Sequence, residues 1–219
     1  MELPQTLHAQ LYLLAYDSKR HQFRFDRWEL FGFALRAAML TDLYLTGYLE
    51  DRGGKAWPAT AAQPADPVLR AALVGATGRE WAQLISYRAH HARQVVRDQL
   101  EAAGWVRRQQ RRMLGIIPTT RLGLYDEDMV SGLADCVTEA LRNAIDGRPT
   151  DPRPLAVGLL AVQAQMPVIF SFIENSRHRE DLREMTFVAI EPIFGLHQVI
   201  QNHYAYVRSR MGNILREST

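Results

Sequence analysis

One predicted helix carries the residues whose types and spacing point most directly to chemistry. Along residues 85–103, apolar side chains recur at steps of three and four, which is typical of a helix that packs against a core. The opposite face of this helix carries His90, Arg93 and Arg97. An arginine stays charged and offers a planar fork of N–H donors that matches a phosphate group. This face is therefore predicted to bind an anion.

A predicted β-hairpin follows the helix, which Gly104 ends. We expect the two strands at residues 105–109 and 114–118, with Arg111 and Arg112 near the tip. Beside these arginines lie the apolar residues Met113, Leu114, Ile116 and Ile117. The hairpin is thus predicted to be basic at first and apolar afterwards.

A further arginine, Arg36, lies inside a strongly apolar helix predicted over residues 28–49. Its neighbours along this helix include Phe33, Leu35, Met39 and Leu40. A guanidinium keeps its proton, so its burial without a partner is costly. Three outcomes remain open: the side chain reaches out to solvent, it pairs with Asp42 or Glu29, or it holds an anion.

The pattern of the whole chain predicts a mainly α protein, a single globular helical domain over residues 1–219 around a central apolar helix bundle with one β-hairpin. Residues 51–67, rich in Gly, Ala and Pro, are expected to form an exposed connection. Residues 146–154 form the best internal boundary. Helices are expected at residues 3–16, 28–49, 68–73, 78–104 (in one or two pieces), 126–144, 155–173, 185–200 and 202–216.

The most apolar stretch, residues 155–173, approaches the roughly 20 residues that a membrane span needs. Polar residues and a proline interrupt it, at Gln163, Gln165, Pro167 and Ser171. We therefore expect a buried pair of helices here rather than a transmembrane segment.

Composition narrows the classes of function. A net charge of +2 is too small for a protein that coats nucleic acid, so nucleic acid is disfavoured as a partner. The single cysteine, Cys136, excludes an intramolecular disulfide and fits a reducing compartment. It lies on an apolar face of a predicted helix, so we expect it to be buried. No secretory signal opens the chain, which predicts a cytoplasmic protein.

The patterns of catalytic and metal sites are missing from the sequence. His90 and His91 are adjacent, so they should point to different sides of a helix and cannot hold a metal together. No nucleophile elbow, phosphate-binding glycine loop or dinucleotide fingerprint occurs. We therefore predict a protein that is not an enzyme and uses no metal or cofactor.

The basic helix and hairpin allow three interpretations. In a winged-helix protein, the helix would enter the DNA major groove and the hairpin would contact phosphate. In a lipid-binding protein, Arg93 and its neighbours would grip a headgroup while the apolar half of the hairpin touches the bilayer. Apolar residues beside arginines favour the membrane, because a DNA-binding wing should be polar where it is exposed. The third interpretation is a protein–protein assembly module, for instance a homo-oligomer.

Three segments resemble the Golgi phosphoprotein 3 family: LRAAMLTDL at residues 35–43, ARQVVRDQLEAAGWV at residues 92–106, and the apolar helix after Pro152. The resemblance runs in the same order from about Leu7 to Ile200. It implies a peripheral membrane protein that binds a phosphoinositide such as phosphatidylinositol 4-phosphate, with a largely helical fold and a hydrophobic hairpin beside a basic pocket. The chain is similar to the short bacterial members, because it has no counterpart of the long basic N-terminal tail of eukaryotic ones.

The resemblance also implies site residues. Two family arginines fall on Arg36 and Arg93, and a third falls on His90, whose partial charge near neutrality predicts weaker or pH-dependent binding. The pocket tryptophan of the family aligns with Arg27, next to Trp28. The predicted phosphate site therefore comprises Arg36, Arg93, His90, Arg97, Arg27 and Trp28, and the predicted membrane-contacting residues are Met113, Leu114, Ile116 and Ile117. The expected partner is an anionic, phosphoinositide-like phospholipid, and the expected location is cytoplasmic and peripheral to the membrane.

Overall fold

The fold is mainly α, which confirms the predicted class. The computed structural model describes residues 2–24, 28–113, 117–166, 179–187 and 190–217. Its helices are α1 (Leu7–Leu13), α2 (Trp28–Leu45), α3 (Pro67–Leu73), α4 (Trp81–Ser86), α5 (Ala89–Ala102), α6 (Glu127–Ile145), α7 (Pro152–Gln163), α9 (Arg179–Phe187) and α10 (Glu191–Glu217). Its strands are β1 (Tyr16–Asp17), β2 (Gln22–Phe23), β3 (Leu49–Asp51), β4 (Lys55–Pro58), β5 (Arg79–Glu80), β6 (Val106–Met113) and β7 (Ile117–Leu124).

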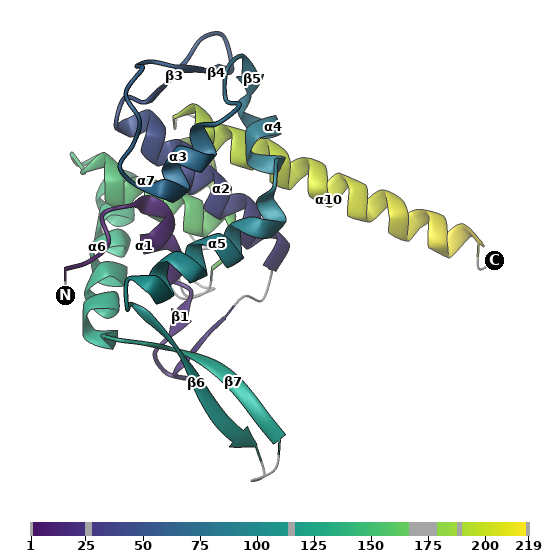
Figure 1. Ribbon diagram of the computed structural model, residues 1–219. Helices are drawn as coiled ribbons and strands as arrows, with labels where there is room; N and C mark the ends of the chain where they lie inside the picture. Colours follow the sequence, from purple (N-terminus) through teal and green to yellow (C-terminus); the bar gives the residue numbers. More distant parts are fainter. Residues whose placement is uncertain (1, 25–27, 114–116, 167–178, 188–189, 218–219) are drawn as a thin grey trace.

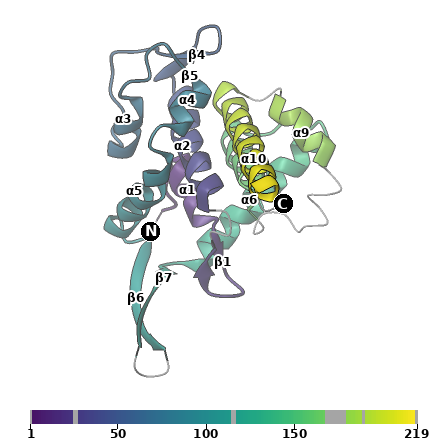
Figure 2. The ribbon, with the colours of Figure 1, turned by 90° about the vertical axis from the view of Figure 1, so that its right-hand side faces the viewer.

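Helix α2 is the centre of the helix bundle. It packs against α1, α3, α4, α5, α7 and α10, so nearly every residue from Leu30 to Leu43 is buried. A helix that is covered on all sides needs apolar residues on all sides, which explains why its sequence is so uniformly apolar. Figure 2 views the molecule nearly along α10 and shows α2 between α10 and α5.

The basic helix of the sequence is divided in two. Helix α4 ends at Ser86 and α5 begins at Ala89, with Arg88 between them in the left-handed region at φ 56°. As predicted, α5 is amphipathic and buries Ala89, Ala92, Val96 and Leu100. Helices α2 and α5 meet at backbone distance, because a Cβ atom on Gly32 would lie 2.6 Å from the carbonyl oxygen of Ala89. Gly32 therefore allows the two helices to approach this closely.

The predicted hairpin is present but its strands are longer than expected. Strands β6 and β7 pair antiparallel from Val106 opposite Leu124 to Met113 opposite Ile117, and they project from the helical body (Figure 1). As predicted, Arg111 and Arg112 lie near the tip, because they pair with Thr119 and Pro118 and only the pair of Met113 with Ile117 follows them in the described ladder. Residues 119–124 extend the ladder beyond the expected strand. The predicted tip residues Leu114 and Ile116 lie outside the described residues.

Three other expectations are corrected. The connection at residues 51–67 contributes to a three-stranded sheet in the order β3-β4-β5, whose strands are too short to show a clear period in sequence. The helices expected at residues 185–200 and 202–216 are instead the end of α9 and the continuous α10. Cys136 is exposed, not buried, because the core-facing stripe of α6 passes through its neighbours Leu133 and Val137.

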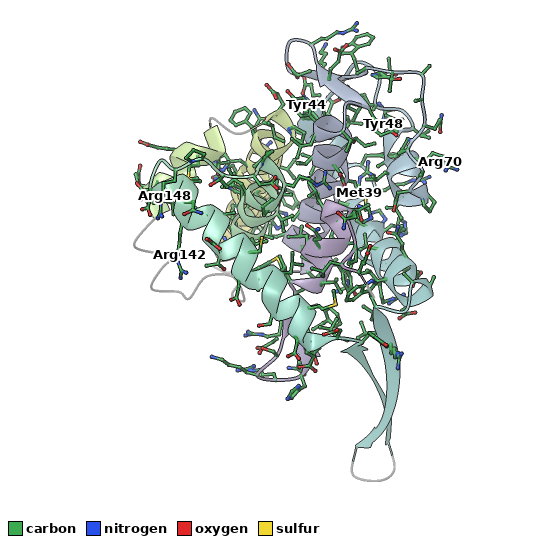
Figure 3. All side chains as sticks on the ribbon, turned by 90° about the vertical axis from the view of Figure 1, so that its left-hand side faces the viewer. Met39, Tyr44, Tyr48, Arg70, Arg142 and Arg148 are labelled. Atoms are coloured by element: carbon green, nitrogen blue, oxygen red, sulfur yellow. The ribbon has the colours of Figure 1, made fainter. Side chains whose placement is uncertain are left out.

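Helix α7 follows the predicted boundary at residues 146–154 and packs against both α6 and α2. Asp42 of α2 is 2% exposed and joins this region to the N-terminal helix. Its carboxylate accepts hydrogen bonds from the Leu7 backbone N–H at 2.9 Å and from Arg153 Nη2 at 3.0 Å. Figure 3 shows Met39, one turn earlier on α2, in the interior, and Arg142 and Arg148 on the outer side near the end of α6. Within the described ranges, no helix is both long enough and apolar enough to cross a membrane.

A buried histidine on α1 predicts a loss of stability in acid. Burial lowers the pKa of His8 from its ordinary 6.5, although a hydrogen bond to Gln99 opposes this shift. The unfolded chain therefore takes up a proton on this residue first as the pH falls below about 6.5, and folding stability is lost from there down to the folded pKa. We expect wild type to lose more stability than His8→Gln between about pH 7 and pH 5, as measured by urea unfolding. Equal losses in the two proteins would contradict this assignment.

A candidate anion-binding pocket between α2, α5 and α10

A pocket of about 300 Å³ opens where four helices meet. The first turns of α2, the end of α4 with the start of α5, and the middle of α10 provide its walls. Its lining residues are Trp28, Glu29, Gly32, Phe33, Ser86, Ala89, His90, Arg93 and His203. Three predicted phosphate-site residues, Trp28, His90 and Arg93, thus lie around one cavity.

The α2 wall is aromatic and acidic. Trp28 and Gly32 share one face of the helix because they lie four positions apart, and Phe33 also lines the pocket. Trp28 lies in the first turn and is 53% exposed, so its ring is available at the mouth of the pocket. Glu29 adds a carboxylate, which the sequence did not predict for this site.

The α5 wall is cationic. His90 and Arg93 lie on successive turns of the polar face of α5, and both are exposed. The ring of His91 lies against that of His90, with 4.0 Å between the ring centroids, so the two adjacent histidines are not separated on opposite sides of the helix as predicted. Three exposed basic groups at the start of α5 can donate to an anion in or near the pocket.

The α10 wall contributes His203, which the sequence did not single out. Its Nε2 atom lies 3.1 Å from Glu29 Oε2, and its ring meets that of Phe33 edge to face at 6.0 Å between centroids. Sequence spacing gives no signal for this contact, because it depends on how α10 crosses α2. The sequence indicates only the face of α10 on which His203 lies. It follows the buried Ile200 by three residues, which places it near the core-facing side.

Arg36 lies one turn further along α2 and is not a lining residue. It is 9% exposed, and its Nη2 donates to the Leu84 carbonyl oxygen at 3.3 Å while its Nη1 lies 3.8 Å from Met39 Sδ. Its buried Nε has no hydrogen-bond partner among the described residues. Burial lowers the pKa of Arg36, and the nearby Arg88 adds to the shift.

The ion-pair alternatives for Arg36 are wrong within the described part of the chain. Asp42 is bound by Arg153 and the Leu7 N–H, and Glu29 pairs with His203. The guanidinium is also too buried to reach freely into solvent. Arg36 is therefore a buried cation held by a carbonyl group at the end of α4, directly before the junction with α5.

Arg97 is a second predicted site residue that does not line the pocket. Its guanidinium pairs with Asp98 at 2.8 Å and approaches Glu101 at 3.8 Å on the same helix, and it does not line the cavity. Arg27 lies outside the described residues. Of the hairpin residues, Met113 and Ile117 form the last described pair of the β6–β7 ladder.

Several groups of the pocket can bind a charged ligand. Its cationic wall faces an aromatic and acidic wall, and a phosphate or sulfate could accept hydrogen bonds from His90 and Arg93. Among the residues that the structure describes, no group of histidine, cysteine and acidic side chains could hold a metal ion. The geometry therefore fits an anionic ligand with a non-polar or ring-shaped neighbour.

Comparison with known proteins gives the family. No curated protein matches the chain. The family model described as Golgi phosphoprotein 3 (GPP34) matches residues 7–193, which include every lining residue of the pocket except His203. The match covers most of the chain, as the resemblance of the sequence implied. This chain belongs to the Golgi phosphoprotein 3 family.

Proposed function

We propose that this protein is a non-enzymatic peripheral membrane protein that binds the phosphate of an anionic, phosphoinositide-like phospholipid in the pocket between α2, α5 and α10. The observation that carries the proposal is the meeting of Arg93 and His90 from α5 with Trp28 from α2 around one cavity, in a chain of the Golgi phosphoprotein 3 family. Membership of this family supports a phosphoinositide-binding role at the level of the family.

Aromatic and basic residues around the pocket support a membrane-facing orientation. Trp28 is 53% exposed at the mouth, and Tyr87, next to the lining residue Ser86, is 47% exposed. The guanidinium groups of Arg79 and Arg88 lie over the Tyr87 ring, at 5.7 and 5.4 Å from its centroid. Tryptophan, tyrosine and arginine are suited to the polar interface of a bilayer. The apolar half of the hairpin would add a shallow contact.

The winged-helix alternative fits the geometry less well. A recognition helix must present the residues of its N-terminal half to base edges in the major groove. In α5 two of the basic residues of that half, His90 and Arg93, line a cavity whose other walls include α2 and α10. A DNA duplex would need these walls to open, whereas a single headgroup fits the space that is present.

The proposal predicts that Arg93→Ala weakens binding to anionic vesicles. Losing a charge-assisted hydrogen bond of roughly 1.5–3 kcal/mol should lower the affinity about tenfold or more. Co-sedimentation with phosphatidylcholine vesicles containing phosphatidylinositol 4-phosphate measures the effect. Vesicles with phosphatidic acid or phosphatidylglycerol at matched charge test the preference for the headgroup.

Arg142→Ala is the matched control for this test. It removes the same charge from the outer side of α6, away from the pocket (Figure 3). If Arg93→Ala and Arg142→Ala weaken binding equally, only the net charge matters and the pocket is not the lipid site. Stronger binding to duplex DNA than to vesicles would favour the winged-helix alternative.

A further inference from the structure

A contact between a glutamate and a histidine lies in the pocket in which the anion is proposed to bind. Glu29 and His203 both line the cavity, and Glu29 Oε2 lies 3.1 Å from His203 Nε2. The pair bridges α2 and α10, which are far apart in the sequence. His203 also lies beyond residue 193, where the family match ends, so family membership assigns it no role.

The pair contributes little to stability. The side chains of His203 and Glu29 are 24% and 48% exposed, and partly exposed ion pairs are worth only about 0–1 kcal/mol because water screens them. Losing the pair should therefore leave the fold intact. Its position matters for binding instead, because both side chains lie among the groups that an incoming anion would contact.

The charge balance of the pocket makes Glu29 a competitor of the anion. Among the described lining residues, the charged or titratable ones are Glu29 from α2, His90 and Arg93 from α5, and His203 from α10, while α4 adds only the neutral Ser86. The Glu29 carboxylate repels an anion and engages the His203 N–H donor that an anion could use. An anion in this cavity therefore gains a donor from α10 only when Glu29 gives up its partner.

We propose that His203 is an anion-binding residue of this pocket and that Glu29 engages its N–H donor until an anion binds. A bound phosphate or sulfate takes over the His203 N–H from Glu29, and its contacts then include α5 and α10. The inference rests on the proposed function only in that the pocket binds an anion; it does not require that the anion belong to a lipid.

Sulfate binding to four variants tests the inference. Glu29→Gln keeps the size of the side chain but removes the competing charge, and we expect sulfate to bind roughly fivefold more tightly than to wild type. His203→Gln in the Glu29→Gln background removes the new donor, and we expect roughly fivefold weaker binding than in Glu29→Gln alone. The dependence of the melting temperature on sulfate concentration gives the affinities.

A second histidine–glutamate pair supplies matched controls. His21 Nδ1 lies 3.2 Å from Glu127 Oε2, and neither residue lines the pocket. Glu127→Gln and His21→Gln change the net charge in the same way, and we expect neither to alter the sulfate affinity by more than about twofold. Equal effects of Glu29→Gln and Glu127→Gln would overturn the inference, and so would an unchanged affinity when His203 is replaced.

Binding of the same variants to lipid vesicles distinguishes this inference from the proposed function. If the sulfate results are as expected while neither wild type nor Glu29→Gln binds vesicles with phosphatidylinositol 4-phosphate, the inference stands and the lipid function fails. If wild type binds these vesicles through Arg93 but Glu29→Gln does not tighten the binding of sulfate, the inference fails and the lipid function stands. If sulfate stabilises no variant more than it stabilises Arg93→Ala, the pocket binds no anion and the inference is overturned.

Discussion

Arg36→Met is expected to make the protein more stable and a weaker binder of anions. The Arg36 guanidinium is buried with one unpartnered nitrogen, and it contacts a carbonyl group and a thioether but no carboxylate among the described residues. Replacing a buried charge with an apolar residue of similar volume is often neutral or stabilising by about 1–4 kcal/mol. Arg36 lies one turn beyond the lining residue Gly32 on the same face of α2, so its charge should attract an anion toward the pocket.

Thermal unfolding and sulfate binding together test this trade-off. A gain of about 1–3 kcal/mol corresponds to a melting temperature roughly 2–10 °C higher for a chain of this size. Arg36→Lys is the matched control, because it keeps the charge and should keep more of the affinity without the gain in stability. A less stable Arg36→Met variant would show that Arg36 holds the α4–α5 junction together through Leu84 and is present for structural reasons.

Asp42→Ala is expected to destabilise the fold more than any other substitution considered for this protein. The buried carboxylate binds the Leu7 N–H and the Arg153 guanidinium, so its removal leaves a backbone donor and part of a cation without partners. Breaking a buried pair on one side costs about 3–5 kcal/mol. The Arg153 side chain is 34% exposed and water can replace part of its contact, so we expect a loss near 3 kcal/mol.

Urea unfolding measures this loss, and Asp42→Asn is the control. The amide keeps an acceptor for the Leu7 N–H but loses the charge, so it should cost roughly half as much. The melting temperature of Asp42→Ala should fall by roughly 6–12 °C. A fall as small as that of a surface substitution would mean that α1 and α7 are held to α2 by their apolar contacts alone.

The sequence by itself determined the helical class, the central apolar helix and the amphipathic α5. Local spacing is enough for these features, because the 3.6-residue period of a buried stripe is written in consecutive residues. It also indicated Arg36 as unusual, since a guanidinium cannot become neutral on burial, and Arg93 as part of an exposed basic face. The length of the hairpin was harder to predict, because mixed polar and β-branched residues at 119–124 fit a strand or a loop equally well.

Only the tertiary structure decided which residues meet. Helices α4 and α5 are divided at Arg88, whose backbone is left-handed. Arginine rarely adopts this conformation, so the residue type does not predict the break. Asp42 and Glu29, the two carboxylates expected near Arg36, are engaged by Arg153 and His203 instead. The pocket itself joins α2, α5 and α10, whose crossing is set by side-chain packing and by the close approach at Gly32. Contacts between distant segments depend on the packing of whole helices, and no local spacing in the sequence encodes them.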